Sequence, residues 1–80
     1  MLTSGQMRAA RAFLGWTARE LAERSKVHVT TIQRIERGTG PARANSETIW
    51  RVQSVLESAG IAFNTNDGLP TVSLNPSPPD

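Results

Sequence analysis

Apolar residues recur at helical spacing near the start of the chain. Met7, Ala10 and Leu14 lie at i, i+3 and i+7, which places them on one face of a helix that ends at the following glycine. Thr3 and Gln6 precede this stripe at the spacing of a capping box, in which each side chain bonds the other residue's backbone N–H. The pattern therefore predicts a first helix that begins just after Thr3.

Two short helices follow, joined by a turn of three or four residues. A second capping box, Thr17 with Glu20, predicts a helix over residues 18 to 24 or 25. The next helix should begin at residue 28 or 29 and end at Arg37, because Gly38 suits the position after a helix C-terminus. The residues expected to lock the two helices together are Leu21, Ala22, Val27, Ile32 and Ile35.

A fourth helix is predicted beyond the glycine- and proline-containing turn at residues 38–41. Asn45 or Ser46 can cap its start, and Gly60 ends it. Its apolar stripe consists of Ile49, Val52, Leu56 and Ala59.

The pattern changes from helical to alternating after this helix. Apolar and polar residues alternate over residues 61–64 and 71–74, on either side of turn-forming residues 64–68, which predicts a short β-hairpin. The predicted fold class is therefore mainly α, with four helices and a C-terminal hairpin. The expected organisation is a domain over residues 1–60, a β segment over residues 61–74 and a disordered proline-rich tail over residues 75–80.

Composition limits the classes of function. The 80-residue chain has no cysteine and one histidine, so it offers no disulfide, thiolate metal site or multi-histidine site. A chain of this size buries only about 60% of its unfolded surface, which argues against an enclosed active site. We therefore expect no enzyme activity, no catalytic residue, no cofactor and no metal.

The chain also shows no signal for a membrane or for secretion. Its apolar runs are far shorter than the roughly 20 residues needed to span a bilayer. Its start lacks the basic and hydrophobic segments of a signal peptide. The expected location is the cytoplasm, with no membrane partner.

The net charge of +2 conceals an asymmetry. Residues 1–43 carry eight basic and three acidic side chains, whereas residues 44–80 carry one basic and four acidic ones. Eight of the nine cations are arginine, whose planar fork matches phosphates and the guanine edge. The first half of the chain is therefore a candidate surface for an anionic partner.

Residues 18–37 have the spacing of a helix-turn-helix, in which the first helix braces the second for entry into the major groove of DNA. Over residues 5–60 the sequence resembles the XRE/Cro/C1 family of phage-repressor-like small transcriptional regulators. The segments that carry the resemblance are Leu14-Gly15-Trp16-Thr17, Glu20-Leu21-Ala22, Val27, Thr31-Ile32 and Arg34-Ile35-Glu36-Arg37-Gly38. The resemblance implies a four-helix Cro/C1-type domain that binds double-stranded DNA.

Three positions depart from the family's usual pattern. Lys26 stands where the family usually has a turn glycine, so a non-glycine residue is expected at positive φ. His28 stands where a serine or threonine usually caps the third helix, which should weaken the start of that helix. Ala18 stands where a glutamine is frequent, which leaves only a backbone amide for contact.

The outward face of the third helix supplies the candidates for reading bases, because Ile32 and Ile35 face inward. Val29 suits a thymine methyl, Gln33 suits adenine and Arg34 suits guanine. The alternative is that this face is only solvated. The full base-reading set is Val29, Thr30, Gln33 and Arg34.

Candidates for phosphate contact flank this face, because positive side chains and free helix N-terminal amides bind phosphates. The N-terminus of the second helix and the loop after the third helix supply most of them. Arg8 belongs either to this rim or to solvent. The phosphate set is Thr17, Ala18, Arg19, His28, Thr31, Arg37 and Arg43.

Two pairs of residues have a structural interpretation. By resemblance, Arg11 of the first helix pairs with Glu36 near the end of the third and fixes the orientation of the helices. Trp16 is expected in the core at the family's apolar position between helices, and Phe13 is expected to fill the same core beside Leu14.

A homodimer is the expected assembly, since a two-stranded hairpin this short is not stable alone. The alternative is that the hairpin packs on the first and fourth helices within one chain. The residues expected at the dimer interface are Trp50, Val55, Leu56, Ala59, Ile61, Phe63, Val72 and Leu74.

These observations predict a sequence-specific DNA-binding transcriptional regulator, most simply a dimeric repressor that inserts residues 29–37 into the major groove of a palindromic operator. The alternative is a protein-interaction module, with an antitoxin-like or antiactivator role, that binds a protein partner through the hairpin or the tail.

Overall fold

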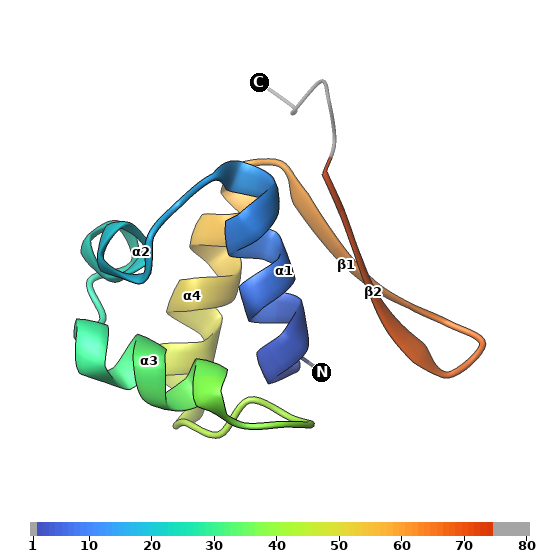
Figure 1. The fold of residues 1–80 in the computed structure, drawn as a ribbon, viewed down its shortest axis with the longest axis horizontal. Coiled ribbons are helices and arrows are strands. Elements are labelled where there is room, and N and C mark those ends of the chain that lie inside the picture. Colours follow the sequence, from blue (N-terminus) through green and yellow to red (C-terminus); the bar gives the residue numbers. More distant parts are fainter. Residues whose placement is uncertain (1, 75–80) are drawn as a thin grey trace.

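The computed structural model describes residues 2–74 and consists of four helices followed by a two-stranded antiparallel sheet (Figure 1). The predicted fold class is confirmed. The expected tail at residues 75–80 lies outside the described residues. The elements are α1 Ser4–Leu14, α2 Ala18–Ser25, α3 Val29–Arg37, α4 Ser46–Ser58, β1 Ile61–Asn66 and β2 Leu69–Leu74.

The helices begin where the sequence predicts, because side chains cap three of them. Thr3 and Gln6 exchange both hydrogen bonds of a capping box at α1, and the Asn45 side chain accepts from a backbone N–H in the first turn of α4. At α2, Thr17 accepts from the Glu20 backbone N–H, but the reciprocal bond of the expected box is not formed. The Glu20 carboxylate lies instead 3.5 Å from Arg24, one turn further on.

The hairpin is longer than predicted because its turn is shorter. Asp67 and Gly68 both have positive φ, 53° and 77°, which is the backbone of a two-residue type I′ turn. The remaining residues of the expected turn therefore pair with the opposite strand, as in Thr65 with Pro70 and Asn66 with Leu69.

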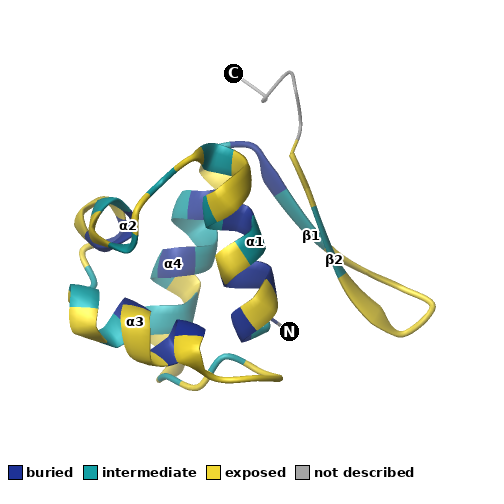
Figure 2. Ribbon diagram, viewed as in Figure 1, coloured by how far each residue is buried: buried dark blue, intermediate teal, exposed yellow. Residues whose placement is uncertain are grey.

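The hydrophobic core lies between the four helices (Figure 2). Met7, Leu21, Ile32, Val52 and Leu56 are completely buried, as their stripes predict. Trp16 and Val27 are partly buried and pack against this core.

Phe13 does not fill the core, and the prediction that it does is wrong. Its side chain is 52% exposed, because it lies on the flank of α1 rather than on the stripe of Met7 and Ala10. It lines a shallow groove between α1 and β2, with Pro70 and Val72 on the opposite side.

The first residues of the chain hold the loop that follows α3. Leu2 is buried, Thr3 forms an isolated antiparallel bridge with Pro41, and the Ala42 N–H donates to the Leu2 carbonyl at 3.0 Å. The Ser4 N–H donates to the Gly40 carbonyl at 2.9 Å. This loop is therefore tied to the start of α1.

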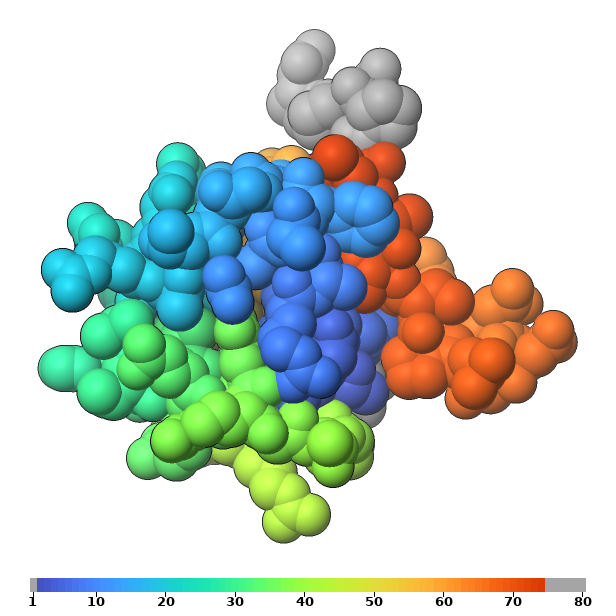
Figure 3. All heavy atoms as spheres, viewed as in Figure 1, coloured from blue at the N-terminus to red at the C-terminus, as the bar shows by residue number. Residues whose placement is uncertain are grey.

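The base of the hairpin packs on α1 and α4 of its own chain. Ile61 is buried and Phe63 is partly buried. Gln6 of α1 donates its Nε2 hydrogens to the carbonyls of Thr71 at 3.0 Å and Asn64 at 3.5 Å. The tip is exposed and projects from the helices on the side opposite α2 and α3 (Figures 1 and 3).

Candidate nucleic-acid interface

The turn between α2 and α3 consists of residues 26–28. Lys26 adopts the left-handed conformation, with φ 57° and ψ 39°, and its N–H donates to the Ala22 carbonyl. The sequence predicts this positive φ, which costs a non-glycine residue about 1 kcal/mol. His28 precedes α3 and its side chain forms no cap, as its departure from the serine or threonine pattern predicts.

The faces of α3 are sharply divided. Ile32, Ile35 and Glu36 are buried, whereas the opposite side is exposed (Figure 2). Of the base-reading candidates, Val29 is half-buried. The exposed candidates are Thr30, Gln33 and Arg34.

The C-terminal end of α3 lacks the left-handed residue that satisfies the last carbonyls of many helices, since Gly38 is extended. Side chains of α1 bind these carbonyls instead. Ser4 Oγ donates to the Ile35 carbonyl at 2.7 Å. Arg8 Nη1 donates to the Glu36 carbonyl and, at 3.2 Å, to the Gly38 carbonyl.

Arg11 and Glu36 form the ion pair that the resemblance implies. Arg11 Nε and Nη2 donate to the two carboxylate oxygens at 2.9 and 2.7 Å, and Nη1 donates to the Trp16 carbonyl at 2.9 Å. The hydrogen bond to Glu36 raises the pKa of Arg11, against the opposing effect of partial burial. The Arg11 guanidinium thus joins α1, α3 and the loop that precedes α2.

A cleft of about 460 Å³ lies where these three helices meet. It brings together two phosphate candidates, Ala18 and Arg37, and the base-reading candidate Gln33. It also contains Arg8, for which the sequence leaves open a role at the rim or simple solvation. The remaining lining residues are Arg11 and Glu36.

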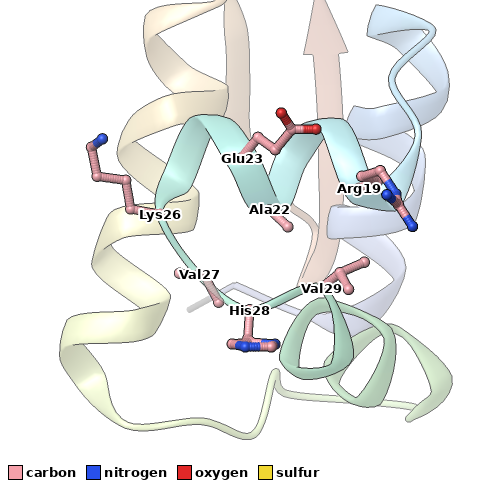
Figure 4. A pocket seen from close by; sticks show the side chains of 7 residues that line it. All are labelled: Arg19, Ala22, Glu23, Lys26, Val27, His28 and Val29. Carbon is pink, nitrogen blue, oxygen red and sulfur yellow. The ribbon is translucent and has the colours of Figure 1, made fainter.

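A second cleft, of about 580 Å³, occupies the corner between α2 and α3 (Figure 4). It contains the candidates Arg19, His28 and Val29. Lys26 and Glu23 are directed away from the turn, and Ala22 is directed toward it (Figure 4).

The other phosphate candidates line neither of these two clefts. Thr17 and Arg43 are exposed, and Thr31 is half-buried. Arg24, by contrast, has its guanidinium carbon 4.4 Å from the centroid of the Trp16 ring, which is a cation–π contact. Arg24 is therefore engaged within the chain.

The candidate interface residues for a dimer divide into two groups. Leu56 and Ile61 belong to the core of their own chain, 0% and 3% exposed, so they cannot contact a second copy in this conformation. Trp50 is 69% exposed and Leu74 is 40% exposed. The partly buried candidates are Val55, Ala59, Phe63 and Val72.

Four helices with this turn and this divided third helix define the helix-turn-helix class. The family model described as Helix-turn-helix matches residues 7–59 of the chain. The chain belongs to this family, of XRE/Cro/C1 type, which is a family of DNA-binding regulatory domains. A comparison with curated proteins finds no match. Within residues 2–74, no helix has both the length and the apolar character to cross a membrane.

Proposed function

We propose that this protein is a sequence-specific transcriptional regulator, a repressor that acts as a homodimer on a palindromic operator in the cytoplasm. The observation that carries the proposal is the division of α3. Its buried residues and the α1 side chains hold the helix, and Thr30, Gln33 and Arg34 are left exposed. A helix held in this way presents side chains to base edges in the major groove.

Each exposed side chain has a proposed role. Gln33 pairs with adenine and Arg34 with guanine, each through two hydrogen bonds, and Val29 contacts a thymine methyl. Thr30 bonds a base edge or a phosphate. Residues at the flanks bind phosphates and set the register of the helix; they are Thr17, Ala18, Arg19, His28, Thr31, Arg37 and Arg43.

The proposed dimer uses apolar side chains that are not buried within one chain. Trp50 of α4 and Leu74 of β2 are the large apolar side chains available from the expected interface. Phe63 and Val72, which are directly paired, pack partly against the core of their own chain and offer a partner only their exposed parts. For this dimer to bind a palindrome, an isologous contact through these residues must set the two recognition helices one turn of DNA, about 34 Å, apart.

The test is selection of bound sequences from a random DNA pool by the purified protein at about 150 mM salt, where non-specific binding is weakened. The expected result is a palindrome with half-sites about 10 base pairs apart. An empty or unstructured selection would contradict the proposal.

Two variants separate the proposed roles on the selected sequence. Arg34→Ala should relax preference at one base position, whereas Arg43→Ala should weaken binding to all sequences alike. Equal losses on every sequence from both variants would contradict the assignment of Arg34 to base reading.

The second candidate is a protein-interaction module. The observation that favours it is the projecting hairpin, whose Leu69 is 67% exposed near the tip. In that case Gln33→Ala and Arg34→Ala would leave binding of the protein partner intact, and variants in the hairpin would abolish that binding.

A further inference from the structure

Arg8 is held by acceptors that carry no formal charge. Its Nη1 donates to the backbone carbonyls of Glu36 and Gly38, at the end of α3. These bonds fix the position of the guanidinium without neutralising it. Among residues 2–74, Nε and Nη2 of Arg8 have no hydrogen-bond partner. These two nitrogens of the guanidinium are therefore available to bind a ligand.

The nearby carboxylate is already occupied. Glu36 accepts both bonds of the Arg11 fork, and its side chain is only 8% exposed. In the part of the chain that the structure describes, neither Arg8 nor Arg37 has an acidic side chain within ion-pair distance. The cleft between α1, α2 and α3 therefore contains three arginines and one carboxylate. Its two remaining positive charges, those of Arg8 and Arg37, are not compensated.

The surroundings of the cleft favour an oxyanion that belongs to DNA. Ala18, the first residue of α2, lines the cleft, and the first backbone amides of a helix are donors without partners in the helix. Gln33, on the exposed face of α3, lines it as well. An anion bound beside Gln33 lies at the edge of the same groove that α3 would enter.

We propose that the cleft between α1, α2 and α3 is a preformed site for one DNA backbone phosphate, with Arg8 as its central ligand and Arg37 as the second. This inference rests on the proposed function and names a phosphate ligand on α1. Because Arg8 also binds the end of α3, a phosphate bound there fixes the recognition helix in register as well as adding affinity.

The experiment measures the dependence of DNA affinity on salt concentration for the full chain, its Arg8→Gln variant and an Arg51→Gln control. The control removes the same charge from α4, where Arg51 pairs only with Glu47 in the described structure. Affinities are measured for the selected sequence and for an unrelated duplex. Circular dichroism at each salt concentration verifies that every variant is folded.

If Arg8 binds a phosphate, Arg8→Gln lowers the steepness of log affinity against log salt by about 0.9 on both duplexes, and Arg51→Gln leaves it unchanged. Arg8→Lys, which keeps the charge but not the fork, should retain the steepness of the unmodified protein. Arg37→Gln provides a second measurement, since its exposed side chain forms no ion pair among residues 2–74, and it should lower the steepness in the same way.

Three results would overturn the inference, and they can be distinguished. If Arg8 only caps α3, Arg8→Gln reduces affinity for the selected sequence more than for the unrelated duplex, and the salt dependence stays the same. If Arg51→Gln changes the salt dependence equally, the effect comes from total charge rather than from this cleft. If the unmodified protein binds neither duplex, the proposed function itself fails.

Discussion

The α2–α3 unit and the hairpin are both pairs of elements joined by a tight turn, but the chain holds them in opposite ways. Leu21 and Ile32 are completely buried between α2 and α3, and three side chains of α1 bind the end of α3. In the hairpin, Ile61 is the buried residue at the base and burial decreases toward the tip along β1, while both ends of β2 are exposed. The first unit is thus fixed from several sides, whereas the second is fixed at one end.

This difference fits the tasks proposed for the two regions. A helix that reads bases must be held in a defined position, because small displacements break hydrogen bonds to base edges. A surface that meets a partner must leave apolar groups uncovered, as Leu69 and Leu74 of the hairpin are here. The following predictions test this comparison, from the largest expected effect to the smallest.

The largest effect should come from the core between α2 and α3. Leu21→Ala leaves a cavity beneath the turn and should lower the free energy of unfolding by about 3 kcal/mol. Urea denaturation followed by circular dichroism measures the loss. The matched control is Leu69→Ala in the exposed part of the hairpin, which should change it by less than about 0.5 kcal/mol. Similar losses in the two variants would contradict the comparison.

The ion pair between α1 and α3 should give the next largest effect. Glu36→Leu leaves the partly buried Arg11 without its carboxylate and should lower the free energy of unfolding by about 2 kcal/mol. The double variant Arg11→Met, Glu36→Leu removes both charges and should cost less than the single one. A double-mutant cycle of unfolding free energies, with Arg11→Met as the other single variant, decides the point. A larger loss in the double variant would show that the pair itself stabilises the fold.

A smaller and local effect should come from the hairpin turn. Gly68 has φ 77°, and a Cβ added to it would have no atom within 4 Å, so Gly68→Ala meets backbone strain but no clash. This substitution should lower the free energy of unfolding by about 1 kcal/mol. Amide hydrogen exchange should become faster in β1 and β2 and stay unchanged in α2 and α3, as expected if the hairpin opens independently. Faster exchange throughout the chain would contradict this independence.

The smallest effect should come from the turn between α2 and α3. Lys26→Gly relieves the positive φ but makes the unfolded chain more flexible, so the net gain in unfolding free energy should be about 0.5 kcal/mol. Thermal denaturation measures it, and Lys26→Ala, which keeps the strain, serves as the control. A destabilised glycine variant would indicate that the Lys26 side chain stabilises the turn.

Local patterns predicted most of the helical fold, since stripes and caps depend on residues three or four positions apart. They predicted the Thr3 capping box and the buried α3 face, whereas the positive φ of Lys26 was expected from the family resemblance. Two predictions were wrong although local patterns decide them. Phe13 lies on the flank of α1, off the stripe of Met7 and Ala10, and Asp67 and Gly68 alone form the hairpin turn, because residues 64–66 pair with β2.

Sequence patterns could not predict the contacts of Arg8, because a distant element supplies its acceptors. Its acceptors are main-chain carbonyls, 28 and 30 residues away, and any residue carries a carbonyl. The Arg11 pair was found because its acceptor is a side chain that the family resemblance identifies. Arginines that bind backbone require the positions of the helices to be known.

The divided third helix has a consequence for how such a protein can diverge. The residues that secure α3, such as Ile32, Ile35 and Glu36, are separate from the exposed Gln33 and Arg34. Surface substitutions away from caps and buried groups change stability little. If Gln33 and Arg34 read bases as proposed, the preferred DNA sequence can be exchanged by replacing a few outward side chains, in evolution or by design, while the scaffold beneath them remains the same.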